Sequence, residues 1–289
     1  GFGIILGGVL NIILDPVFMF VLLPDGLEVF GAGAATCLSN CIACVYFFVV
    51  LYTGRKGSVI TFSPRVGMAS RESILAVFAV GLPSAVTSFL FDLDYVILDK
   101  LMVSYHNTAL TAIGIVLKVE RFPLNAGVGI CQGMMPLVGY NYSAGNRRRL
   151  RDIIRMSLAV GLVIAAVSIL LYELFAAELV RVFLDDSRTV ELAASFLRVR
   201  VLATPLMFVS FFTVYLFQAL GKGNTSTVLA VVRWLGFNIP MLYILNAAFG
   251  MYGLVWSQVT ADSLTVVLSI AVYLKFRPPL LRAEKLPER

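Results

Sequence analysis

The sequence predicts an all-α, polytopic membrane protein, and two observations carry that prediction. Hydrophobic residues make up 59% of the 289 residues and charged residues only 14%, whereas about a quarter of the residues of a soluble globular protein are charged. Apolar runs of roughly 20 residues, the length that crosses ~30 Å of hydrocarbon, also recur along the chain. We therefore expect the chain to lie in a membrane.

The apolar runs predict about eight transmembrane helices. They cover residues 3–23, 32–53, 74–103, 109–139, 151–175, 192–220, 225–248 and 253–275. The sequence opens with Gly1 inside an apolar run and not with Met. We accordingly expect further helices upstream of the first span.

The distribution of basic residues predicts the orientation. Fifteen of the 23 lysines and arginines lie in or beside the segments 54–73 and 143–150, at Lys222, and from Lys275 to the end of the chain, whereas the intervening loops contain only Arg181 and Arg188. By the positive-inside rule the basic segments, including the C-terminus, face the cytoplasm of a plasma membrane. The net charge of +6 is thus a topology signal, and we expect no nucleic-acid partner.

Three of the four cysteines share one helix face. Cys37, Cys41 and Cys44 are spaced four and three residues apart, and Cys131 lies elsewhere. Small apolar residues at this spacing are typical of helix-to-helix packing. Because no His joins them and one helix face rarely completes a metal coordination shell, we predict no metal site.

An internal repeat suggests two bundles. Asn11 begins a segment that passes through Pro16 and a loop to Gly33, and Asn238 begins a similar segment that passes through Pro240 to Gly253. Both copies start on the predicted cytoplasmic side. Repeats with the same direction predict two pseudo-symmetric bundles related by an axis along the membrane normal.

Five segments carry a resemblance to a known family. They are Leu10–Phe20, Gly33–Ser39, Gly81–Ser84, Gly129–Asn146 and Leu220–Lys222, and the most specific is the block Gln132-Gly133…Pro136…Gly139-Tyr140-Asn141-Tyr142. In these segments the chain resembles the multidrug and toxic compound extrusion (MATE) family, within the multidrug/oligosaccharidyl-lipid/polysaccharide exporter superfamily. The resemblance covers nearly the whole chain.

The resemblance implies the domain organisation. The family has twelve helices in two six-helix lobes, and this chain resembles helices five to twelve. Residues 1–53 would then be the last two helices of an incomplete N-terminal bundle, 54–73 a cytoplasmic connector, 74–276 a six-helix C-terminal bundle and 277–289 a cytoplasmic tail.

Asp15 is the leading candidate for a functional residue. A carboxylate within a span costs roughly 2.5–3.5 kcal/mol on insertion scales, which makes function the default interpretation. Asn11 lies four residues earlier on the same helix face. The resemblance assigns Asn11, Asp15 and Thr36 to a binding site for Na⁺ or H⁺. A purely structural role, in which these hydrogen bonds lock two helices together, stays open.

A second polar set lies further along the chain. Asp92 lies near the place where family members often carry an acidic residue, and Asp92, Lys118 and Gln132 are a possible second-lobe cation or substrate site. Asp94 points to another face than Asp92. Lys118 or Arg121 is expected to pair with Asp92.

Other charged residues within the spans are weaker candidates. Glu120 belongs to the charged run that begins at Lys118, and a structural role is as plausible for this run as a role in gating. We interpret Arg198, Arg200 and Arg233 as anchors near the cytoplasmic halves of their helices. Asp262 in the last span is the weakest candidate.

These observations together predict a secondary active multidrug exporter, in which an organic, cationic substrate leaves while Na⁺ or H⁺ enters. No nucleotide-binding, nucleophile-elbow or zinc motif is present in the sequence, so we expect neither an enzyme nor a cofactor other than the coupling ion. The expected partners are small organic molecules and membrane lipid, and the protein is expected to be monomeric. The alternatives are a lipid-linked oligosaccharide or polysaccharide flippase, a lipid-modifying membrane enzyme, and a non-transporting membrane subunit.

Overall fold

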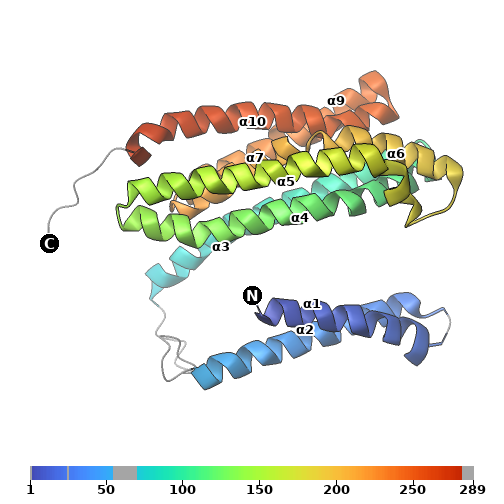
Figure 1. The fold of residues 1–289 in the computed structure, drawn as a ribbon, viewed down its shortest axis with the longest axis horizontal. Coiled ribbons are helices and arrows are strands. Elements are labelled where there is room, and N and C mark those ends of the chain that lie inside the picture. Colours follow the sequence, from blue (N-terminus) through green and yellow to red (C-terminus); the bar gives the residue numbers. More distant parts are fainter. Residues whose placement is uncertain (1, 25, 55–69, 282–289) are drawn as a thin grey trace. The chain divides into compact units, whose positions relative to one another are not determined.

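A computed structural model describes residues 2–24, 26–54 and 70–281 of the chain (Figure 1). Every regular element within these residues is helical. The chain divides into two compact units, Gly1–Ser70 and Arg71–Arg289. The division falls inside the predicted connector, most of which lies outside the described residues, as do residues 282–289 of the predicted tail.

The first unit is an antiparallel pair of helices. The helix α1 (Phe2–Val17) continues into a π-helix, η1 (Phe18–Leu22), and α2 (Glu28–Thr53) returns beside them. Pro16 lies at the end of α1, where its missing N–H removes one helical hydrogen bond. The wider π-helix begins two residues later, and short π-helical turns of this kind occur mostly as interruptions of α-helices.

Small residues let the two helices of the first unit approach closely. A Cβ atom placed on Gly3 would lie 2.5 Å from the ring of Phe47, and one placed on Gly7 would lie 3.2 Å from the Cβ of Ala43. Both contacts match residues near the start of α1 with residues near the end of α2, as an antiparallel pair requires. Close approach through small residues is the usual packing mode of membrane helices.

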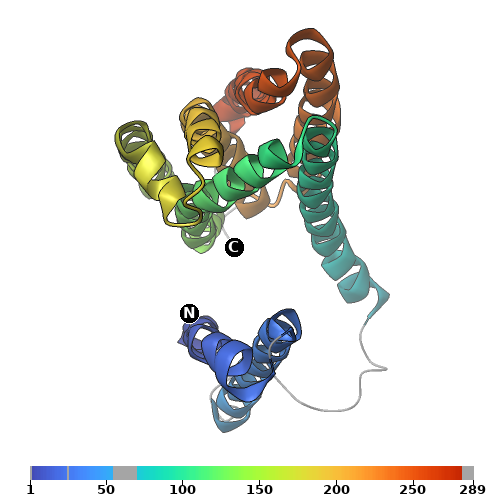
Figure 2. The same ribbon diagram turned by 90° about the vertical axis from the view of Figure 1, so that its right-hand side faces the viewer.

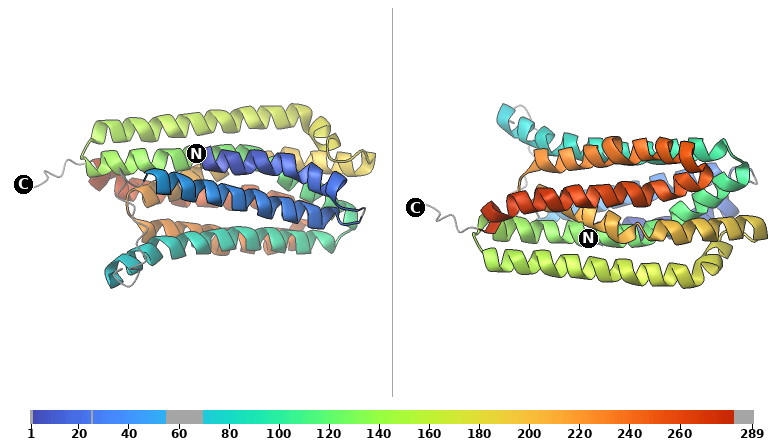
Figure 3. Two further views of the ribbon diagram at one scale, coloured as in Figure 1. Left: turned by 90° about the horizontal axis from the view of Figure 1, so that it is seen from below. Right: turned by 90° about the horizontal axis from the view of Figure 1, so that it is seen from above.

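The second unit is a bundle of long helices (Figures 1 and 3). Its elements are α3 (Arg71–Val103), α4 (Asn107–Ser143), α5 (Arg147–Arg181), α6 (Ser187–Val201), α7 (Thr204–Ala219), α8 (Gly223–Val231), the π-helix η4 (Val232–Asn238), α9 (Ile239–Phe249) and α10 (Met251–Leu281). Figure 2 views this bundle along its helices. The pair α6–α7 and the run α8–η4–α9 each occupy one predicted span, so all eight predicted segments are helical.

Several of these segments are long and apolar enough to cross a membrane. Five helices meet that criterion among the described residues, or six when the bent pair α6–α7 is taken as one span. The helices α3 and α4, which carry charged residues along their length, are not among them. The prediction of an all-α polytopic membrane protein is confirmed.

Two apolar cores fill the interior of the second unit. One is built around residues such as Leu98, Val119 and Val201, and the other around residues such as Cys131 and Phe208. On α4, Glu120 directly follows Val119 of the first core and precedes Cys131 of the second. Buried charged side chains therefore lie where one core gives way to the other.

Two backbone irregularities lie next to buried arginines. The helices α6 and α7 meet at a 47° bend, one residue after Arg200, and Pro205 occupies the first turn of α7, where a missing N–H is tolerated. Arg233 lies within the π-helix η4. Irregular backbone at membrane depth is tolerated where it is buried in protein, and both arginines are 2% exposed.

The structure revises the internal repeat at one position. A Cβ atom on Gly253 would lie 1.9 Å from the carbonyl oxygen of Leu245, and one on Gly31 would lie 2.9 Å from the carbonyl oxygen of Phe18. Nothing lies within 4 Å of a Cβ placed on Gly33. In the first copy, the glycine in close contact with the backbone of the preceding segment is thus Gly31. The sequence pairing of Gly33 with Gly253 was wrong in this respect.

Candidate functional site

The structure brings Asn11, Asp15 and Thr36 together, and we call them the first-unit cluster. The side-chain amide of Asn11 donates a hydrogen bond of 2.9 Å to Asp15 Oδ1 and lies 3.3 Å from Thr36 Oγ1, to which it also donates. The Thr36 hydroxyl in turn donates to the carbonyl of Ala32 at 2.8 Å. Asn11 and Asp15 are half-buried within the two-helix unit, and Thr36 is exposed.

No positive side chain compensates Asp15 within its own helix pair. Residues 1–54 contain no Lys, Arg or His, and no ion pair involves Asp15 in the described part of the chain. Among the described residues, the carboxylate is therefore held by its hydrogen bond from Asn11 and by no ion pair. Carboxylate and hydroxyl oxygens are the ligands that a hard cation prefers, and a carboxylate also takes up a proton.

The second predicted set does not form a cluster. Asp92, Lys118 and Gln132 are all exposed on the second unit, and no hydrogen bond or ion pair between them occurs among the described residues. Arg121 was expected as a partner of Asp92, but its guanidinium lies 5.6 Å from the ring centre of Tyr95. The role of the three residues as a cation or substrate site stays a prediction.

The second unit instead contains five buried charged side chains that we call the buried charge cluster: Asp94, Glu120, Arg200, Arg233 and Asp262, each at most 4% exposed. Its best-defined contact joins α4 to α6. Arg200 donates from Nε to Glu120 Oε2 at 2.7 Å and from Nη2 to Glu120 Oε1 at 3.2 Å. A two-pronged contact of this kind is strong and fixes geometry.

A second ion pair joins the π-helix to the last helix. Arg233 Nη2 lies 2.9 Å from Asp262 Oδ1, and Gln258 donates to Asp262 Oδ2 at 2.5 Å. The Arg233 guanidinium also stacks 4.4 Å from the ring centre of Phe211. Both Arg200 and Arg233 are therefore fully buried partners in ion pairs.

That finding corrects the interpretation of the arginines as cytoplasmic anchors. Of Arg198, Arg200 and Arg233, only Arg198 lies at the surface of the unit, half-exposed and 3.9 Å from Glu173. Hydropathy along one helix does not show which acid on another helix faces a buried arginine. Glu120 and Arg200 are 80 positions apart in the sequence.

Three residues of this region have buried polar atoms without a hydrogen bond among the described residues, and one of them is Arg233, whose Nε and Nη2 form none although Nη2 lies 2.9 Å from Asp262 Oδ1. Asp94 Oδ1 and both amide atoms of Asn238 are buried and accept or donate no hydrogen bond among the described residues. Asp94 lies within electrostatic reach of the other four charged groups. The cluster thus contains three carboxylates and two guanidinium groups, and Asp94 is the carboxylate without a pair.

Sequence reasoning overlooked Asp94, although a signal was present. Asp94 is spaced by four residues from Leu90 and Leu98 and by eight from Met102, and all three are buried. An apolar stripe with this spacing marks the interior face of a helix. Asp92 was favoured because it lies near the place where family members often carry an acidic residue, but its side chain is exposed, as are those of Val96 and Val103 on the same face.

The space beside the buried charge cluster is small. Glu120, Gly127, Gly161 and Phe208 line a cavity of about 10 Å³, which is room for about one water molecule. A Cβ atom on Gly161 would lie 1.8 Å from Phe208 Cζ, so this glycine is what allows the ring to fill the interior. This cavity, as the described residues line it, is too small for an organic molecule.

Comparisons with known proteins agree with this architecture. A sequence profile of the MatE family matches residues 83–244, more than half of the chain. The chain belongs to the MatE family. Within the MatE match lie Asp94, Glu120, Arg200 and Arg233, whereas the first-unit cluster and Asp262 lie outside it.

Curated relatives extend the MatE assignment over most of the chain. Multidrug export protein MepA of Staphylococcus saprophyticus is 29% identical over 278 residues, which cover 96% of this chain and 60% of that protein. The protein of the same name from Staphylococcus aureus strain N315 is 29% identical over 272 residues, covering 94% of this chain and 58% of the relative. The chain spans about 60% of the length of these relatives.

Solved structures share the fold of this MatE chain. An outward-facing MATE transporter superposes with a TM-score of 0.86 at 21% identity, covering 96% of this chain and 62% of that one. A transporter of the same superfamily from Pyrococcus furiosus, described as having a binding pocket of reverse polarity that suggests a different function, gives 0.81 at 20% identity over 99% and 63%. These likenesses establish the fold.

Proposed function

We propose that this MatE protein exports small organic molecules across the plasma membrane in exchange for a cation, Na⁺ or H⁺, that moves inward. Its membership of a transporter family and the names of the two staphylococcal relatives support export. Two bundles that rock about a fixed site would give alternating access. The organic cation is the proposed substrate class.

The observation that carries the coupling proposal is the first-unit cluster. Asp15 accepts a hydrogen bond from Asn11, whose amide also donates to the Thr36 hydroxyl of the adjacent helix, and Asp15 has no positive partner in its helix pair. An uncompensated carboxylate within a span is expensive. Binding a proton or Na⁺ removes that cost, so the occupancy of Asp15 follows the cation gradient.

The alternatives fit these observations less well. A flippase for lipid-linked oligosaccharides needs a strongly cationic interior, but both buried arginines of the second unit are paired with acids. A lipid-modifying enzyme needs converging catalytic groups at the membrane interface, and His106 instead caps α4 by accepting from the Ala109 N–H. A non-transporting subunit has no use for an uncompensated carboxylate in a span.

The test is an efflux assay on the full-length protein reconstituted into liposomes and loaded with the fluorescent cation ethidium. An imposed Na⁺ gradient and an imposed H⁺ gradient are applied separately. We expect one of them to drive efflux above that of protein-free liposomes. If neither gradient accelerates efflux, while the protein is folded and inserted, the proposal of cation-coupled export fails.

A further inference from the structure

An apolar groove lies on the second unit between α5 and α10. It has a volume of about 180 Å³ and is lined by α5, α7 and α10, with Arg155, Leu158, Phe212, Thr213, Leu216 and Ile270 among its residues. The helices α5 and α10 each pack against α7 and make at most marginal contact with one another. The groove therefore has α7 as its floor and the two outer helices as its walls.

The floor of the groove is apolar in spite of its threonine. Phe212 and Leu216 are buried. The Thr213 hydroxyl donates to the carbonyl of Val209 at 2.9 Å, so its hydrogen bond is satisfied within its own helix. No Asp or Glu is among the described residues that line the groove, which makes it unsuitable for an organic cation.

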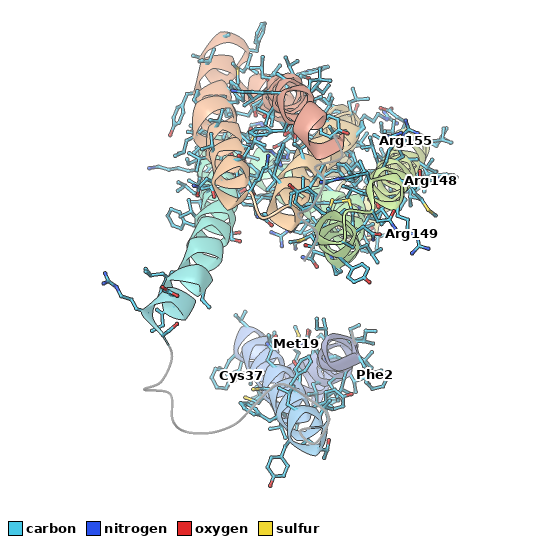
Figure 4. The ribbon with its side chains drawn as sticks, turned by 90° about the vertical axis from the view of Figure 1, so that its left-hand side faces the viewer. Phe2, Met19, Cys37, Arg148, Arg149 and Arg155 are labelled. Atoms are coloured by element: carbon cyan, nitrogen blue, oxygen red, sulfur yellow. The ribbon has the colours of Figure 1, made fainter. Side chains whose placement is uncertain are left out.

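One wall of the groove carries a strong positive charge. Five arginines occur within residues 147–155, together with one acid, Asp152. None of the five forms an ion pair within the described ranges. Figure 4 shows Arg148, Arg149 and Arg155 on this end of α5, with Arg155 and Arg149 on different sides of the helix, and only Arg155 lines the groove.

The length of α5 places these arginines at the level of lipid headgroups. Its part before the kink at Phe175, residues 147–174, corresponds to roughly 42 Å at 1.5 Å per residue, which exceeds the ~30 Å hydrocarbon layer. Arg155 lies about 12 Å along the axis from the start of the helix. From that depth its long side chain reaches back to the interface, while Leu158 and Ile270 lie beside hydrocarbon.

We propose that this groove binds one acyl chain of an anionic phospholipid, with the lipid phosphate held by Arg155. The volume is below the roughly 300–1,000 Å³ of pockets for drug-sized ligands, but a single flexible chain fits a narrow apolar channel. The basic wall selects a headgroup with net negative charge. This inference rests on the groove and on α5, and it is independent of the proposed transport activity.

Native mass spectrometry of the purified full-length protein tests the site. The protein is titrated with phosphatidylglycerol or with phosphatidylcholine of the same acyl chains, and the first bound lipid is quantified. We expect phosphatidylglycerol to bind more tightly, and Arg155→Ala to weaken its binding about fivefold, the contribution of one basic residue near anionic lipid. Arg149→Ala, which removes the same charge from another side of α5, is expected to change the affinity less than about twofold.

A second pair of variants tests the acyl chain. Ile270→Trp fills the groove and is expected to abolish tight binding of the first phosphatidylglycerol. Val267→Trp, at an exposed position of α10 outside the groove, is expected to preserve that binding. The side chains of Ile270 and Val267 are 50% and 68% exposed, so both positions tolerate a larger residue. Equal losses of phosphatidylglycerol affinity for Arg155→Ala and Arg149→Ala would show that the lipid is held by general electrostatic attraction to α5 and not by a site at Arg155, which would overturn the proposal. Equal binding of the two lipids, or full binding by Ile270→Trp, would also overturn the proposal.

Discussion

The two units of this protein stabilise charged side chains within their helices in different ways. In the first unit one acid, Asp15, accepts a hydrogen bond from an amide that also donates to a hydroxyl of the neighbouring helix, with no basic residue in either helix. In the second unit three acids and two arginines are buried together, and two of the acids are in ion pairs. Charge compensation is thus the main difference between the clusters.

We expect that difference to separate a site that responds to cations from one that supports the fold. A carboxylate without a positive partner changes its state when a proton or Na⁺ binds. A carboxylate in a buried ion pair is already neutralised, and removing its partner leaves an isolated charge that costs several kcal/mol. The comparison therefore predicts loss of coupling from changes in the first-unit cluster and loss of stability from changes in the buried charge cluster.

The largest effect is expected from Asp15→Asn. Asparagine is nearly isosteric and preserves hydrogen bonding with its neighbours, but it neither takes up a proton nor supplies charge to Na⁺. We expect gradient-driven efflux to fall to the background of protein-free liposomes. The free energy of unfolding in detergent should change by less than about 1 kcal/mol, or rise, because a desolvated charge is removed.

A matched control for Asp15→Asn is available in the same unit. Glu28→Gln removes an exposed carboxylate at the start of α2 that accepts from the Gly26 N–H at 2.9 Å, so the charge change is identical. This variant should export at near the wild-type rate. Wild-type efflux by well-expressed Asp15→Asn would make Asp15 a packing residue and remove the contrast between the units.

The first-unit cluster was predictable because its members obey local rules. Asn11 and Asp15 are one helical turn apart, and Thr36 lies on the next helix of an antiparallel pair, so spacing and the family resemblance together bring them close. The pair Glu120–Arg200 is different, because it depends on how α4 packs against α6 across 80 positions. Hydropathy likewise predicted the eight helical segments, but not the bend after Arg200 or the π-helix around Arg233, since both reflect packing within the bundle.

The second largest effect is expected from Arg200→Met. The variant leaves Glu120 buried without its partner, which costs about 3–5 kcal/mol. The free energy of unfolding in mixed micelles should fall by that amount. The double variant Glu120→Gln with Arg200→Met should recover most of the loss, since an apolar or neutral pair of similar volume is often as stable as a buried ion pair.

Arg198→Met is the matched control on the same helix. Arg198 lies 3.9 Å from Glu173 with both side chains about half exposed, and surface pairs of this kind contribute about 0–1 kcal/mol. A loss of similar size for Arg198→Met and Arg200→Met would show that burial does not distinguish the two pairs. The buried charge cluster would then not be the stabilising element of the second unit.

A smaller effect is expected from Gly253→Ala, which compares the two copies of the internal repeat. The new Cβ would lie 1.9 Å from the Leu245 carbonyl oxygen, so α9 and α10 must separate at a cost of about 1–3 kcal/mol. Gly31→Ala, with 2.9 Å to the Phe18 carbonyl, should cost less. Gly114→Ala, where nothing lies within 4 Å, should be neutral or stabilising, because alanine favours helix. Thermal unfolding in detergent measures the stability of all three variants. Equal losses of stability would show that α9 and α10 do not approach closely at Gly253.

The smallest effect is expected from Asp94→Asn, and it tests the comparison most directly. Asp94 is the unpaired acid of the buried charge cluster, and its Oδ1 lacks a protein partner among the described residues. Neutralising it leaves both ion pairs intact and balances two acids against two guanidinium groups. The free energy of unfolding should therefore change by less than about 1 kcal/mol, or rise, and efflux should persist. Efflux that fails in Asp94→Asn but survives in Asp15→Asn would place the coupling acid in the second unit. The two ion pairs near Asp94 would then position a coupling residue. The presence of ion pairs would no longer distinguish a cluster that couples transport to a cation from a cluster that stabilises the fold.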